Sequence, residues 1–141
     1  MDIYLEFIGN NSLLFIALLV IVLLLSQSIF NDLTRKHKLL SAPEAIDLIN
    51  KQNAAIIDTR TQSEFNAGHI ADAILIPLPE IQSKPDALKK YSEQPVLFYC
   101  KSGPRADDAC KKLLKQGHGR VFALRGGLQA WQEANMPLIK K

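Results

Sequence analysis

The segment around Cys100 contains the residue types best suited to chemistry. Cys100 follows the apolar run Pro95–Tyr99 and precedes Lys101–Arg105 (KSGPR), after which a helix is predicted over 106–116. Backbone amides of such a loop can converge on the sulfur, and the positive end of the following helix dipole adds to their effect. This environment stabilises a thiolate, the nucleophilic form of cysteine. The pattern therefore predicts a nucleophilic thiol at the end of a strand.

The residues after Cys100 add charge and backbone freedom. Lys101 and Arg105 bring positive charge close to the sulfur, and Gly103 permits the backbone conformations that a tight loop requires. Pro104 has no N–H, so one donor to the sulfur is missing. A lone cysteine after a strand is more often a packing residue, so motifs elsewhere in the chain must decide between catalysis and packing.

The second cysteine, Cys110, falls on the inward face of the predicted helix, where a thiol packs well. A role as a resolving thiol is the lesser alternative. Neither cysteine has another Cys or a His at metal-ligand spacing, so we expect no metal site and no cofactor. Nothing in the sequence favours a disulfide, and both cysteines are interpreted as thiols.

The rest of the chain alternates between predicted strands and helices. Short apolar runs predict buried strands, and Ser41-Ala-Pro-Glu44 and Thr61-x-x-Glu64 are patterns typical of helix N-termini. Strands separated by helices indicate an α/β fold with a mainly parallel sheet and helices on both faces. The predicted strands cover 54–58, 73–77, 95–99 and 121–124, and the predicted helices cover 41–50, 61–67, 106–116 and 127–133.

An apolar segment precedes this domain. Leu13–Leu25 is uninterrupted, and 25 uncharged residues separate Glu6 from Asp32, whereas about 20 are needed to cross a bilayer. A cleavable signal peptide would need a basic start and a small-residue cleavage site, and a buried helix would need a polar stripe. We therefore predict a transmembrane anchor over 1–30, a juxtamembrane linker over 31–38 and one domain over 39–141.

Charge predicts the orientation of the anchor. Arg35, Lys36 and Lys38 follow the apolar segment, and no Lys or Arg precedes it. The positive-inside rule then places the N-terminus outside and the domain in the cytoplasm, most simply at a bacterial inner membrane. Residues 31–141 contain five more Lys and Arg than Asp and Glu, which favours an anionic lipid surface or small anionic substrates. Nothing in the sequence indicates a nucleic-acid partner.

Four stretches, in this order, resemble the single-domain rhodaneses. They are Ile57-Asp58-Thr59-Arg60, Glu64-Phe65-x-x-Gly68-His69-Ile70-x-x-Ala73, the Cys100–Arg105 loop, and Leu124-Arg-Gly-Gly-Leu-x-Ala-Trp131. The resemblance covers 38–138 and implies a central, mainly parallel, five-stranded sheet flanked by helices. It also implies that the cysteine takes sulfane sulfur from a small donor such as thiosulfate, holds it as a persulfide and passes it to a thiol or other thiophilic acceptor.

The resemblance also assigns roles to residues. Cys100 would be the nucleophile, Arg105 would bind the anionic donor, and Lys101 would tune donor preference. The loop from Lys101 through Ser102 and Gly103 would cradle the transferred sulfur with its amides. Supporting roles would fall to three residues outside the loop, which are Asp58 and Arg60 at a neighbouring strand end and His69 in a turn.

Two residues depart from the family pattern. Asp72 stands where the family usually has glycine, which changes a turn and adds a negative charge near the mouth of the site. Pro104 lies inside the loop and removes an amide donor, while the thiol and Arg105 remain in place.

Two other functions fit parts of the pattern. The first is a phosphatase or arsenate reductase, but tyrosine-type phosphatases need a Cys-x5-Arg loop and only four residues separate Cys100 from Arg105. The second alternative is a membrane-tethered adaptor that keeps the rhodanese fold to bind a membrane protein complex, with little or no catalysis. Retention of both Cys100 and Arg105 favours the enzyme.

Overall fold

The computed structural model describes residues 1–140, and the chain divides into two compact units, 1–35 and 36–141. The first unit contains helices α1 (Asp2–Asn10) and α2 (Ser12–Thr34). α2 has 23 residues and no buried side chain, and it is long and apolar enough to cross a membrane. Its helical structure continues four residues beyond the end of the predicted anchor at residue 30.

The second unit is built on a five-stranded sheet, as predicted. Its strands are β1 (Lys38–Leu40), β2 (Ala55–Asp58), β3 (Ile74–Leu75), β4 (Val96–Tyr99) and β5 (Val121–Leu124). The spatial order is β1-β5-β4-β2-β3, and every neighbouring pair is parallel. Lys38, which ends the predicted linker, already belongs to β1, a strand that the sequence pattern did not reveal.

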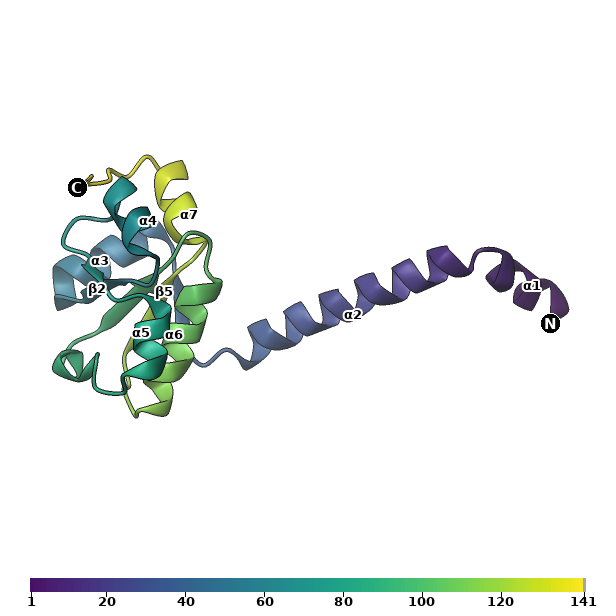
Figure 1. Ribbon diagram of the computed structural model, residues 1–141, viewed down its shortest axis with the longest axis horizontal. Helices are drawn as coiled ribbons and strands as arrows, with labels where there is room; N and C mark the ends of the chain where they lie inside the picture. The colour runs from purple at the N-terminus through teal and green to yellow at the C-terminus, as the bar shows by residue number, and fades with distance from the viewer. Residues whose placement is uncertain (141) are drawn as a thin grey trace. The chain divides into compact units, whose positions relative to one another are not determined.

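Helices cover both faces of the sheet (Figure 1). On one face, α3 (Ala42–Gln52) and α7 (Gly127–Glu133) contribute Leu48, Leu128 and Trp131 to a core with Leu97 and Tyr99. On the other face, residues of α5 (Leu78–Ser83) and α6 (Pro104–Lys115) pack with alternate residues of the same strands. Because both faces are covered, β2 and β4 are buried along their entire length, which explains their continuous apolar runs.

Local signals in the sequence set several helix ends. Ser41 accepts a hydrogen bond from the Glu44 amide at the start of α3. At α4 (Gln62–Ala67) the predicted capping box is complete, because the Thr61 hydroxyl accepts from the Glu64 amide while the Glu64 carboxylate accepts from the Thr61 amide. The segment between α5 and β4 adds one short 3-10 turn, η1 (Lys89–Tyr91).

Candidate active site

Three strand ends converge on the predicted nucleophile. β4 is the middle strand of the sheet, and Cys100 follows it directly. Thr59 and Arg60 follow β2 on one side, and Gly126 and Gly127 follow β5 on the other. The carboxyl ends of parallel strands are where α/β folds place their ligands, so the topology puts Cys100 at the expected position.

The Cys100 sulfur is held by the loop that follows it. The Gly103 amide donates a hydrogen bond to Sγ over 3.0 Å, and α6 begins at the next residue, Pro104. Gly103 has φ 137°, a conformation that few residues other than glycine adopt. Cys100 is only 1% exposed. One amide and the start of a twelve-residue helix therefore face a nearly buried sulfur.

The carbonyl side of the same loop is held by the start of α7. The amides of Leu128 and Gln129 donate to the carbonyl oxygens of Cys100 and Lys101 over 2.8 and 3.1 Å. This approach requires a glycine at Gly127, whose φ is +59°, because a Cβ there would lie 2.5 Å from the Cys100 carbonyl oxygen. In the sequence, this glycine contributed only to a family resemblance, and its contact with the loop was not predicted.

Gly127→Ala should therefore disturb the Cys100–Arg105 loop as well as the fold. We expect a loss of roughly 2 kcal/mol in the free energy of unfolding, since the added Cβ meets backbone atoms and the conformation is strained. Denaturant unfolding and the alkylation rate of Cys100 would measure both effects. Gly119→Ala is the matched control, because a Cβ there meets nothing within 4 Å. Equal unfolding free energies and equal Cys100 alkylation rates in the two variants would contradict this account of the loop.

Arg105 is engaged by a carboxylate that the sequence analysis did not assign to the site. Its Nη1 and Nη2 atoms donate to Glu64 Oε2 and Oε1 over 2.9 and 3.3 Å, and each side chain is 34% exposed. The bond from Arg105 lowers the Glu64 pKa from its usual 4.5 to about 2. The pair therefore stabilises the fold above pH 4.5, and that contribution is lost as the pH falls towards 2.

The charge of Arg105 also interacts with the predicted nucleophile, Cys100. The hydrogen bond that Arg105 donates to Glu64 is the main cause of a raised Arg105 pKa, and the negative charge of a Cys100 thiolate raises it further. The Arg105 guanidinium is bound by both carboxylate oxygens of Glu64. A role for Arg105 in binding an anionic donor beside Cys100 stays a prediction.

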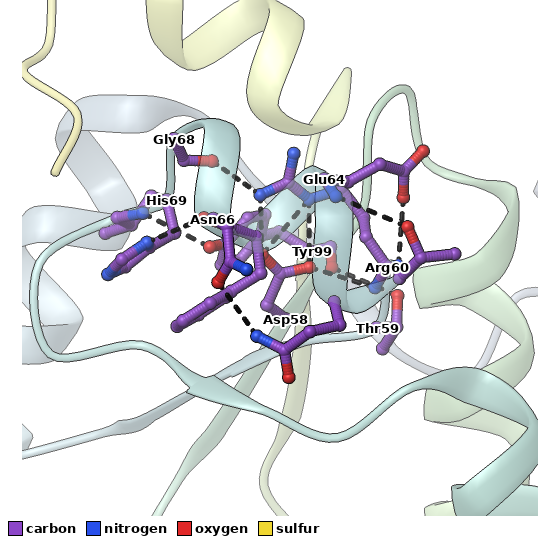
Figure 2. Close-up of polar contacts among 12 residues, drawn as sticks. Asp58, Thr59, Arg60, Glu64, Asn66, Gly68, His69 and Tyr99 are labelled. Atoms are coloured by element: carbon purple, nitrogen blue, oxygen red, sulfur yellow. Dashed lines mark hydrogen bonds and ion pairs between the residues drawn. The ribbon is translucent and has the colours of Figure 1, made fainter. Parts of the chain in front are cut away.

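Asp58 and Arg60 form a buried ion pair beside the site (Figure 2). Arg60 Nη2 lies 2.7 Å from Asp58 Oδ2 and also donates to the Gly68 carbonyl over 2.7 Å. The Asp58 Oδ1 atom accepts from the Arg60 amide and Nε. The Arg60 guanidinium lies over the ring of Tyr99, the residue before Cys100. This pair joins the end of β2 to the end of α4, which carries Glu64.

Asp58→Asn should be strongly destabilising, because it leaves the buried Arg60 without its counter-ion. We expect a loss of roughly 3–5 kcal/mol, measured by denaturant unfolding. Asp47→Asn is the control, because Asp47 forms a largely exposed 3.7 Å pair with Lys51 and should change stability by under about 0.5 kcal/mol. A similar, small effect of both substitutions would show that the buried pair does not brace the strand ends.

The remaining predicted residues lie around this arrangement. Lys101 and Ser102 are exposed on the loop. The His69 ring stacks on Phe65 and shares a 2.9 Å hydrogen bond with its carbonyl, which fits the expected structural role. Asp72 adopts φ 64° in an exposed turn, so it takes a left-handed conformation that suits the glycine of the family pattern. Cys110 is buried in α6, and its thiol donates to the Phe122 carbonyl.

The comparisons with known proteins point to one family. The model of the rhodanese-like domain matches residues 41–134. "Uncharacterized protein YibN" of Escherichia coli K12 is 32% identical over 136 residues, which cover 96% of this chain and 95% of that protein. "Thiosulfate sulfurtransferase GlpE" of Coxiella burnetii is 32% identical over 96 residues, which cover 68% and 88%.

Solved structures agree with the sequence comparisons. The crystal structure of a rhodanese-related protein from Thermoplasma volcanium superposes with a TM-score of 0.65 at 25% identity. The match covers 74% of this chain and all of that one. The parallel sheet, the cysteine at the end of its central strand and the matched family model lead to one conclusion: this chain belongs to the rhodanese family.

Proposed function

We propose that this protein is a sulfurtransferase that carries sulfane sulfur on Cys100. The observation that carries the proposal is the 3.0 Å hydrogen bond from the Gly103 amide to the Cys100 sulfur at the start of α6. An amide and a helix dipole directed at sulfur stabilise a thiolate, and the same groups stabilise the terminal sulfur of a persulfide. The sulfurtransferase name of a relative supports the same chemistry.

The proposed reaction is a double displacement. The Cys100 thiolate attacks the outer sulfur of thiosulfate, the S–S bond of the donor breaks, and sulfite leaves with the bonding electrons. The enzyme then holds Cys–S–S⁻. A thiolate or cyanide attacks the terminal sulfur, takes it away and regenerates the Cys100 thiolate. Lys101 supplies positive charge for the anionic donor, Arg105 adds the part of its charge that Glu64 does not neutralise, and the Gly103 amide positions the sulfur.

Cys100→Ser should abolish the transfer of sulfur, since serine cannot hold a persulfide. The measurement is thiocyanate formation from thiosulfate and cyanide, with initial rates taken over both substrates. Cys110→Ser is the control, because Cys110 is buried in α6 and has no part in the proposed reaction. The native chain should give parallel double-reciprocal plots, the pattern of a free persulfide intermediate. Intersecting plots or activity that survives in Cys100→Ser would contradict the mechanism.

We also propose that α2 anchors the domain to the cytoplasmic face of a bacterial inner membrane. The support is the length and apolar composition of α2 and the basic residues Arg35, Lys36 and Lys38 that follow it. In this proposal the linker 31–38 connects the domain 39–141 to the membrane anchor, and the lipid bilayer is a partner of the protein.

A reporter fused after the last residue tests this topology in a bacterial host. We expect a fluorescent reporter that folds only in the cytoplasm to be active and a periplasmic phosphatase to be inactive. Replacing Arg35 and Lys36 with glutamine should weaken that preference, because the charge bias sets orientation. An active phosphatase on the native chain would place the domain on the other side.

One observation favours a second candidate, a membrane-tethered adaptor with little catalysis. The Cys100 sulfur belongs to a residue that is 1% exposed, so its access to substrates is restricted. An adaptor would bind a membrane protein complex through the folded domain and would not need the thiol. A Cys100→Ser strain that behaves like the native strain, while deletion produces a phenotype, would support the adaptor over the enzyme.

A further inference from the structure

A carboxylate with no part in the proposed reaction binds the guanidinium of Arg105. Glu64 binds the guanidinium through both oxygens, at 2.9 and 3.3 Å. Arg105 is the cation expected to attract an anionic donor, and it interacts electrostatically with Cys100. The ion pair therefore neutralises the charge that Arg105 would otherwise offer to a donor.

Glu64 is fixed in place from several directions. Its Oε2 atom also accepts from the Thr61 amide over 3.0 Å, as part of the capping box that begins α4. The far end of α4 is held by Arg60, which donates to the Gly68 carbonyl over 2.7 Å. Exposed ion pairs between mobile side chains contribute little, but this carboxylate is positioned before any donor arrives.

We propose that Glu64 selects sulfur donors by charge, and this inference rests on the proposed sulfurtransferase function. A dianion such as thiosulfate gains little from a neutralised Arg105 and is repelled by Glu64. A donor with one negative charge is repelled less by Glu64 and depends less on attraction by Arg105. Glu64 therefore favours monoanionic donors in which the sulfane sulfur is attached to an organic group, such as thiosulfonates and thiol persulfides.

A hollow lined by Lys101, the residue after Cys100, is the place that the proposal assigns to the organic group. It has a volume of about 330 Å³, near the lower end of the range for small-molecule sites. Glu64 and Lys101 bring opposite charges to its wall, Leu128 and Leu138 bring apolar surface, and Gln129 and Gln132 bring amides. Thiosulfate has no group to fill this space, whereas an organic donor does.

The transfer from such donors is balanced without another reactant. The Cys100 thiolate attacks the terminal sulfur of R–SO2–S⁻ or R–S–S⁻, and the bond from that sulfur to the rest of the donor breaks. The bonding electrons leave with the sulfinate R–SO2⁻ or the thiolate R–S⁻. The enzyme is left as Cys–S–S⁻, and no proton is transferred.

Thiosulfate and methanethiosulfonate provide a direct test, because they differ by a methyl group in place of one charged oxygen. In Glu64→Gln, kcat/KM for thiosulfate relative to methanethiosulfonate should rise roughly tenfold over the native ratio. Glutamine still accepts the Thr61 amide bond of a capping box, so the start of α4 is preserved. Thermal unfolding of the variant checks that the fold is intact.

Glu80→Gln is the matched control, since Glu80 lies on α5 in an exposed pair with Lys84. Its donor ratio should equal that of the native protein. An unchanged ratio in Glu64→Gln, an equal loss with both donors, or an equal rise in Glu80→Gln would overturn the inference. Failure of both donors to transfer sulfur to the native protein would instead refute the proposed function.

Donors with organic groups of different size test whether the hollow holds that group. Ala67 lines it at the exposed end of α4, so Ala67→Phe should narrow it without adding charge. The KM for benzenethiosulfonate should rise severalfold, while that for methanethiosulfonate should not. An equal effect on both donors would show that the organic group lies elsewhere and would overturn this part of the inference.

Discussion

The turn that joins β4 to α6 is the constraint on which the site depends. Its carbonyl groups at Cys100 and Lys101 are bound by the first amides of α7, and its Gly103 amide is bound to the Cys100 sulfur. The turn is therefore held between two helices that follow adjacent strands. A sulfur fixed in this way requires little reorganisation when it becomes charged, which is the advantage of preorganised donors.

A chain of ion pairs and hydrogen bonds connects this loop to the neighbouring strand. Asp58 holds Arg60, Arg60 holds the Gly68 carbonyl at the end of α4, and α4 presents Glu64 to Arg105. Buried pairs of this kind cost desolvation energy and are weak evidence for stability alone. In the proposed reaction, the effect of these contacts is to fix Glu64 and Arg105, the charges that a donor meets.

The sequence predicted much of this arrangement because the strongest signals are local. Apolar runs before Asp58 and Cys100 and the Thr61–Glu64 capping box lie within a few residues of what they determine. The strand β1 was missed because it has three residues, begins with an exposed lysine and buries only Leu40 fully. No local pattern distinguishes it from a linker.

The contacts that complete the site are distant in sequence and could not be predicted in the same way. Glu64 meets Arg105 across 41 positions, and the amide of Leu128 reaches back to Cys100. In the sequence, the capping pattern and one family stretch both contained Glu64, and neither indicated that its carboxylate binds Arg105. Such pairings follow from the strand order, and only the tertiary structure reveals them.

The measurement that tests the central claim most directly is mass spectrometry of the reduced protein after treatment with a sulfane donor. The account predicts one added sulfur atom on the peptide that contains Cys100, none on the peptide that contains Cys110, and its removal by cyanide. A folded protein that gains no sulfur, or gains it on Cys110 alone, would contradict the claim.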